Sequence, residues 1–170
     1  KTFRRQVDGQ RWTFTVSYPL LTRANFAPIQ AFIIKQRSQK ENFTITFPSY
    51  MNAQGSETGT VLVNGVHAVG DTTIAVDGHA ADSAGSFKAG DLIKFAGHSK
   101  VYMATADMDA DGTGHATLNF APNLLNAVAN DETITFASVP FTVSFTEDIT
   151  QFNTDTSALY GFSMSLVEIF

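Results

Sequence analysis

Residues 4–48, RRQVDGQRWTFTVSYPLLTRANFAPIQAFIIKQRSQKENFTITFP, decide the fold, because they read as a strand, a helix and a second strand. From Arg11 to Pro19, apolar and polar residues alternate strictly, which is the two-residue period of a half-buried strand. Pro19 should end this strand, since proline has no N–H group for the sheet ladder. One face of the strand would carry Trp12, Phe14, Val16 and Tyr18, and the other face Thr13, Thr15 and Ser17.

A helix is predicted after this strand, over about residues 25–38. Thr22 and Asn25 can both cap it. We favour Asn25, because Pro28 then lies in the first turn, where its missing N–H breaks no hydrogen bond. With Thr22 as the cap, Pro28 would lie inside the helix at a cost of roughly 3 kcal/mol. The apolar face of the helix would consist of Phe26, Ile29, Phe32 and Ile33.

Two distant segments share one composition. Residues 43–47 (FTITF) and 141–146 (FTVSFT) both alternate Phe, Thr or Ser and an aliphatic residue. Each pattern is typical of a strand, and we expect the two strands to be neighbours in one sheet. Residues 160–167 alternate in the same way and predict a further strand.

The middle of the chain changes character. Residues 49–60 (SYMNAQGSETGT) are polar and rich in Gly and Ser, as in a linker or a long loop. Six short strand candidates with glycine turns between them follow, a pattern typical of a small barrel of the SH3-like or OB-like kind. They are Val61–Val63, Thr72–Val76, Asp91–Phe95, Val101–Thr105, Ala116–Phe120 and Thr133–Phe136.

Together these patterns predict a mainly β fold with two parts. Residues 1–54 and 140–170 would form a discontinuous β-sandwich domain with one helix, and residues 55–139 an inserted small β-barrel domain. Insertion at a loop between neighbouring strands is structurally cheap, because it leaves both ends of the host domain close together.

The charges are polarised along the chain. Residues 1–40 hold eight Lys and Arg against one Asp, a net charge of +7, whereas residues 41–170 have a net charge of −12. Such a chain can attract a second copy of itself, basic end to acidic face.

We expect no nucleic-acid partner, because the acidic remainder would repel phosphate. We expect no membrane partner, because no apolar run approaches the ~20 residues of a span. The sequence begins at Lys1 without Met, and whether residues precede Lys1 stays open.

One acidic loop resembles a cation site. Asp107, Asp109, Asp111 and Gly112 have the D-x-D-x-D-G spacing that begins a calcium loop. Position twelve of that loop is Leu118 instead of the expected bidentate Glu, and both flanks read as strands. We favour a polar hairpin loop, and weak calcium binding stays open as the alternative.

No catalytic constellation is evident, so we predict neither an enzyme nor a cofactor. The four histidines have no zinc-ligand spacing, and there is no nucleophile elbow and no phosphate-binding loop. A glycosidase-like carboxylate pair drawn from the acidic loop or from Asp131 with Glu132 stays open. We expect these acids to be ordinary exposed loop residues. The histidines are His67, His79, His98 and His115.

Several short motifs carry a resemblance to a known family. Gly9-Gln10-Arg11-Trp12, residues 20–26 (LLTRANF), Pro28 and Phe32 are similar to the start of bacteriophage distal tail proteins. Residues 87–95 (FKAGDLIKF), 100–102 (KVY), 118–122 (LNFAP) and 139–141 (VPF) resemble an inserted barrel found in phage tail proteins.

The resemblance implies a structural role in the virion. Distal tail proteins form hexameric rings that join the tail tube to the hub or to the fibre-bearing baseplate at the tail tip. An inserted barrel would project outward to hold fibres or touch host sugars. Two alternatives stay open: a carbohydrate- or fibre-binding module carried by the barrel, and a tail-associated polysaccharide hydrolase. Our candidates for the subunit interface are Arg4, Arg5, Arg11 and Phe170.

Overall fold

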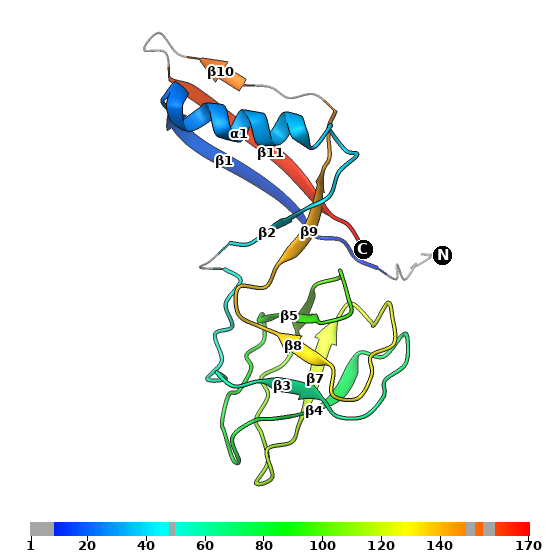
Figure 1. The fold of residues 1–170 in the computed structure, drawn as a ribbon. Helices are drawn as coiled ribbons and strands as arrows, with labels where there is room; N and C mark the ends of the chain where they lie inside the picture. Colours follow the sequence, from blue (N-terminus) through cyan, green and yellow to red (C-terminus); the bar gives the residue numbers. More distant parts are fainter. Residues whose placement is uncertain (1–8, 48–49, 149–151, 155–158) are drawn as a thin grey trace, which may run out of the picture. The chain divides into compact units, whose positions relative to one another are not determined.

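A computed structural model describes residues 9–47, 50–148, 152–154 and 159–170 (Figure 1). The chain divides into two compact units. The helix unit consists of Arg11–Ile45 and Thr142–Ile169, and the barrel unit consists of Lys1–Gln10, Thr46–Phe141 and Phe170. The predicted class, mainly β with one helix and a small barrel, is confirmed.

The helix unit contains one sheet with the strand order β1-β11-β9-β2, and β10 pairs with β11 beyond this path. The predicted pairing of the two Phe-Thr segments is confirmed, because β2 and β9 are neighbours. Among the described residues, the layer that packs on this sheet is the helix, not a second sheet (Figure 1). The elements are β1 (Thr13–Leu21), α1 (Arg23–Lys35), β2 (Phe43–Ile45), β9 (Phe141–Phe145), β10 (Phe152–Thr154) and β11 (Tyr160–Glu168).

Strand β1 continues past Pro19 to Leu21, so the predicted end of this strand was wrong. β1 runs antiparallel to β11, with Thr13 opposite Val167 and Tyr18 opposite Phe162, and its register shifts between Tyr18 and Leu21. Proline is tolerated here because β1 pairs on one side only in the described chain, so the missing N–H removes no ladder bond.

The helix begins earlier than predicted. Thr22, not Asn25, is the N-cap residue, and its carbonyl accepts a hydrogen bond from the N–H of Phe26 at 2.9 Å. Pro28 therefore lies inside α1. Packing offsets the missing hydrogen bond, because the ring of Phe26 is buried and stacks on Tyr160 with 5.0 Å between centroids.

The helix also ends earlier than predicted, with Gln36 as its C-cap residue. Arg37 and Ser38 have φ angles of 52° and 62°, in the left-handed region that an α-helix cannot continue through. The chain turns there towards β2, which is shorter than the predicted residues 43–47.

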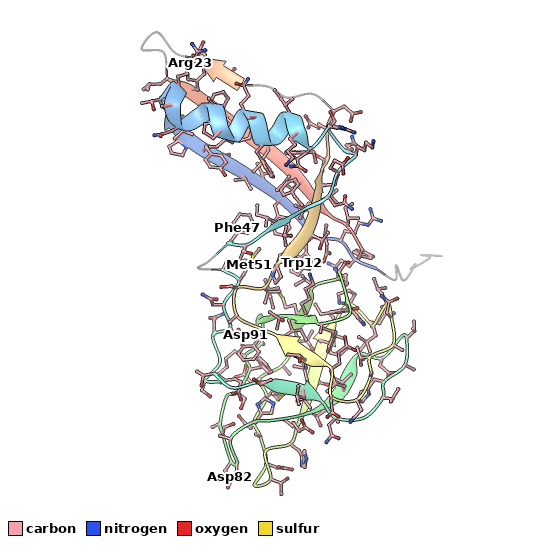
Figure 2. The ribbon with its side chains drawn as sticks, in the orientation of Figure 1. Trp12, Arg23, Phe47, Met51, Asp82 and Asp91 are labelled. Atoms are coloured by element: carbon pink, nitrogen blue, oxygen red, sulfur yellow. The ribbon has the colours of Figure 1, made fainter. Side chains whose placement is uncertain are left out.

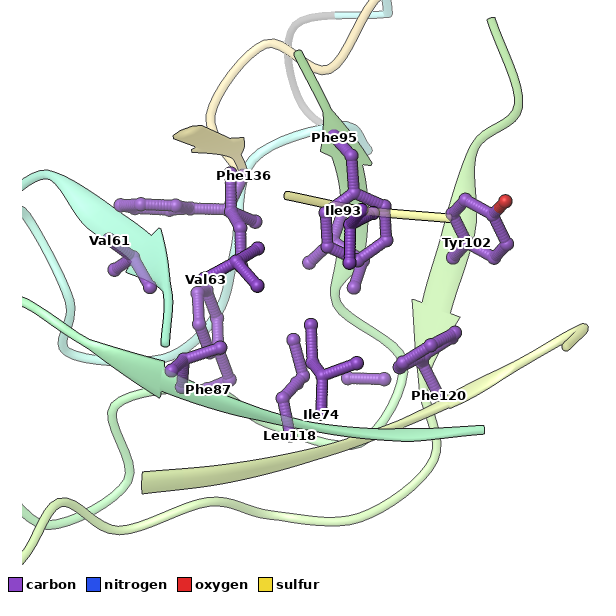
Figure 3. Packing of buried hydrophobic residues seen from close by; sticks show 14 of the residues in the cluster. Val61, Val63, Ile74, Phe87, Ile93, Phe95, Tyr102, Leu118, Phe120 and Phe136 are labelled. Atoms are coloured by element: carbon purple, nitrogen blue, oxygen red, sulfur yellow. The ribbon is translucent and has the colours of Figure 1, made fainter. Parts of the chain in front are cut away.

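The barrel unit contains the six predicted strands, each within two residues of its predicted bounds. They close into a barrel in the order β3-β4-β7-β6-β5-β8. Their apolar residues point inward and form one core, in which Phe95 packs edge-on against both Tyr102 and Phe120 (Figure 3). The strands are β3 (Val61–Val63), β4 (Thr73–Asp77), β5 (Leu92–Phe95), β6 (Tyr102–Ala104), β7 (Ala116–Ala121) and β8 (Thr133–Thr135).

The polar segment before β3 is a loop fastened to the barrel, and not a free linker. The backbone N–H groups of Ala53, Ser56 and Glu57 donate to carbonyls of the barrel unit at 2.9–3.2 Å. The N–H groups of Gln54 and Gly55 donate to the carboxylate of buried Asp91 at 2.7 and 3.2 Å (Asp91 is labelled in Figure 2). The long-loop alternative is therefore the one that the structure supports for residues 53–57.

Candidate functional site

Two aspartates of the acidic loop, for which calcium binding was the alternative, bind protein groups on separate turns. Asp107 accepts hydrogen bonds from Lys88 Nζ at 2.8 Å and from the N–H of Ala89 at 3.0 Å. Asp109 accepts one from the N–H of Gly85 at 2.6 Å. These carboxylates therefore fasten the segment 85–89 to the segment 107–109, which is a structural role.

The third aspartate closes its own turn. Asp111 Oδ1 accepts hydrogen bonds from the hydroxyl and N–H of Thr113 and from the N–H of His115, at 2.7, 2.8 and 3.0 Å. The Thr113 hydroxyl, followed by these N–H groups, lowers the pKa of Asp111 to about 2. Across the described residues, no group of three or more His, Asp or Glu side chains could hold a metal ion. The geometry thus favours the polar hairpin loop.

His79 is buried and pairs with Glu57. Its Nδ1 atom lies 2.6 Å from Glu57 Oε2, and both side chains are almost fully enclosed. Nε2 of His79 has no hydrogen-bond partner in the described structure, and the ring stands edge-on to Phe87. The pair ties residues 53–57 to the segment after β4, and only the Glu57 side chain keeps a small exposed fraction.

The other histidines also hold loops in place. The N–H of Ala75 donates to Nε2 of His67 at 3.2 Å. His98 lies 3.4 Å from both the Tyr102 hydroxyl and the Ala127 carbonyl. Sequence reasoning did not detect these contacts, which tie histidines of two loops to residues of other segments.

Asp131 and Glu132, the carboxylate pair that the sequence left open, also bind nearby protein groups. Glu132 accepts hydrogen bonds from the N–H groups of Gly97 and Ala129 at 2.8 and 3.1 Å. Asp131 accepts one from the Asn130 side chain at 2.7 Å. These contacts orient turns, and they leave no observation that favours a hydrolytic role.

The interface candidates lie in different surroundings. Arg4 and Arg5 fall outside the described residues, and Arg11 is exposed. The ring of Phe170 is partly exposed and lies 5.0 Å from Nζ of Lys100, a lysine only 1% exposed. This cation–π contact involves a buried lysine that the sequence pattern did not single out.

Trp12 lies in the sheet region of the helix unit and is half-buried. Its carbonyl accepts a hydrogen bond from the N–H of Glu168 at 2.8 Å, and its N–H donates to the Glu168 carboxylate at 3.3 Å. Glu168 is fully buried, a feature that its place in an apolar C-terminal strand did not predict.

The helix unit carries an apolar groove that sequence reasoning missed. It has a volume of ≈ 350 Å³ and lies between α1 and the sheet. Tyr18 of β1 and Phe32 of α1 stay 37% and 41% exposed, so helix and sheet do not bury this apolar surface completely. An exposed apolar surface of this kind is a candidate site for apolar contacts. The lining residues are Tyr18, Pro28, Ile29, Phe32, Ile33, Phe43, Thr44, Ile45 and Met164.

The sheet of this unit also has an open edge along β1. In an antiparallel pair, the backbone N–H and C=O groups of successive residues point alternately to the partner strand and away from it. Because the N–H of Glu168 donates to the carbonyl of Trp12, the backbone groups of Trp12 and of every second residue after it point to β11. Thr13, Thr15 and Ser17 direct theirs away from the sheet. Within the described chain β1 pairs with β11 alone, so these three residues offer an unused ladder.

Comparison with known families identifies the barrel unit. A family model described as the B domain of distal tail protein pb9 matches residues 49–139, which is more than half of the chain. No curated protein gives a significant match. No helix among the described residues is long and apolar enough to cross a membrane. The matched segment coincides with the closed barrel and its fastened loop, and the chain therefore belongs to the family of phage distal tail proteins.

Proposed function

We propose that the chain is a structural subunit of the phage tail tip, where copies form a hexameric ring that links the tail tube to hub or fibre proteins of the baseplate. Membership in the distal tail family assigns a structural role in the phage tail. The ring, its symmetry and its neighbours in the virion are our proposal.

The open edge of β1 carries this proposal. Thr13, Thr15 and Ser17 direct their backbone N–H and carbonyl groups outward, and a strand from another molecule can pair with them. The opposite edge is β2, so one copy has two different edges. Contact between unlike edges is head-to-tail, and such contacts close into a ring when the rotation permits.

The apolar groove and the hydrogen-bonded carboxylates support the same role. A groove lined by Phe32, Phe43 and Met164 provides area that assembly would remove from water. Asp107, Asp109 and Glu132, which the sequence left open as catalytic carboxylates, accept hydrogen bonds from backbone N–H groups or from a lysine. We therefore propose an assembly role without catalysis.

The direct test is the mass of the assembly together with its symmetry. Native mass spectrometry and negative-stain class averages of the purified chain should give six copies around a central axis. A stable monomer at the highest attainable protein concentration would contradict the ring.

A further inference from the structure

Two loops of the barrel unit lie side by side and expose apolar residues. Residues 64–72 connect β3 to β4, and residues 122–132 connect β7 to β8. His67 and Val128 form a bridge, with both of their N–H···O bonds at 3.1 Å. In an antiparallel bridge, the residues that flank His67 lie opposite the residues that flank Val128. The side chains of these flanking residues point to the face opposite that of His67 and Val128. This register places Val66 opposite Ala129 and Ala68 opposite Ala127, and Val69 lies in the turn that follows Ala68. We call these five exposed residues the valine patch.

The loops are held in place, so the exposure is a fixed feature. The N–H of Gly65 donates to the Asn130 side chain at 2.6 Å, and that of Gly70 donates to the Leu124 carbonyl at 2.9 Å. Val66 and Val69 nevertheless stay 77% and 62% exposed. A rigid loop that presents apolar side chains loses little conformational entropy on binding, which favours a docking role.

The charge around the patch selects the kind of partner. Asp71 and Asp131 flank it, and the segment Thr46–Phe141 contains only three lysines. Lys88 pairs with Asp107 at 2.8 Å, Lys94 donates to a backbone carbonyl, and Lys100 is buried. The partner should therefore combine an apolar centre with basic residues. A glycan is disfavoured, since residues 64–72 and 122–132 contain no Phe, Tyr or Trp on which a sugar ring could stack.

A surface of this kind is present on the helix unit. Ile33 packs inward, and the next residue of α1, Ile34, is turned about 100° around the helix axis and is 64% exposed. Lys35 and Arg37 beside it are exposed and basic. We propose that the valine patch of one copy docks on the Ile34 surface of α1 in a second copy. This inference rests on the proposed ring and specifies one of its contacts.

The chain has no cysteine, so engineered cysteines can test this contact without background. Ile34→Cys and Val66→Cys are prepared as separate proteins, one of them isotopically labelled, then mixed and oxidised. We expect a labelled–unlabelled disulfide dimer in at least about tenfold higher yield than in a mixture of Ile34→Cys with Ala106→Cys, an exposed control on another barrel loop.

The outcomes separate this contact from the ring itself. A hexameric mass without the Ile34–Val66 disulfide would overturn the contact and leave the ring standing. Disulfides only between two Val66→Cys copies would also overturn it, because they would indicate a patch-to-patch contact. A monomeric mass at all concentrations would overturn both the ring and the contact.

A second variant tests the chemistry of the patch. Val66→Asp should weaken self-association at least about tenfold while leaving the melting temperature unchanged, because the side chain lies outside the core. Ala106→Asp adds the same charge elsewhere and should leave association unchanged. Equal weakening by both variants would overturn the proposed role of the patch.

Discussion

Asp91 holds Gly55 against the barrel: Oδ2 of Asp91 lies 3.2 Å from the backbone nitrogen of Gly55, although the residues are 36 positions apart. The same carboxylate also accepts the N–H groups of Gln54 and Lys88, at 2.7 and 2.8 Å. One side chain that is 2% exposed therefore fastens the loop before β3 to the turn before β5.

Replacing Asp91 by Asn should destabilise the barrel unit by about 2–3 kcal/mol, because an amide has one acceptor oxygen for the three N–H donors that the buried carboxylate binds. Urea unfolding followed by circular dichroism measures the loss. Asp131→Asn, at an exposed carboxylate with a single side-chain contact, is the matched control and should change stability by less than about 0.5 kcal/mol. Equal effects of the two variants would contradict the anchoring role of Asp91.

Gly55→Ala should also destabilise the protein, for a steric reason. A Cβ atom at this position would collide with the backbone carbonyl of Ser86. Relief requires the fastened loop to move, so we expect a loss of about 2–4 kcal/mol. At Gly112 an added Cβ would meet only the Asp82 carboxylate at 3.5 Å, an ordinary contact, so Gly112→Ala should stay within about 0.5 kcal/mol. If Gly55→Ala unfolds at the same urea concentration as wild type, the close packing of this loop is not required.

The pair of Glu57 and His79 predicts acid sensitivity. Burial raises the pKa of Glu57, but the N–H of Gly59 and the hydrogen bond and charge of His79 outweigh it and leave this pKa below its ordinary value of 4.5. A lowered carboxyl pKa contributes stability that is complete above 4.5 and is lost as the pH falls through the lowered value.

Glu57→Gln should therefore reduce the stability near neutral pH and flatten its decline on acidification. Thermal melts between about pH 2 and pH 7 measure both effects. Glu147→Gln, at an exposed glutamate, should leave the curve of the wild type unchanged. If the melting temperature of Glu57→Gln falls as steeply on acidification as that of wild type, other groups cause the acid sensitivity.

Thr15→Pro tests the open edge of β1. The N–H of Thr15 points away from β11, so proline removes a donor that no described strand uses but that a pairing strand needs. We expect self-association to weaken at least about tenfold with the far-ultraviolet spectrum preserved. Thr15→Ala keeps the N–H and should associate like wild type; analytical ultracentrifugation compares the three proteins. Unchanged association of Thr15→Pro would remove β1 pairing from the proposed ring.

Local patterns predicted the elements that depend on neighbouring residues. Strict alternation from Trp12 to Tyr18 located β1, and the glycine-bounded runs located the six barrel strands. The helix limits failed because tertiary packing overrode local preference. The stacking of Phe26 on Tyr160 offsets the cost of Pro28 inside α1. The sequence around Phe26 does not reveal this contact, because Tyr160 lies far away along the chain.

The functional residues divide in the same way. Residue types at short spacing were enough to predict that Asp107, Asp109 and Asp111 occupy a polar loop and that the chain resembles distal tail proteins. The role of Asp91 as an anchor and the exposure of Val66 and Val69 on fixed loops became visible in the folded chain alone. Those properties depend on hydrogen bonds between segments tens of residues apart, which short-range patterns do not record.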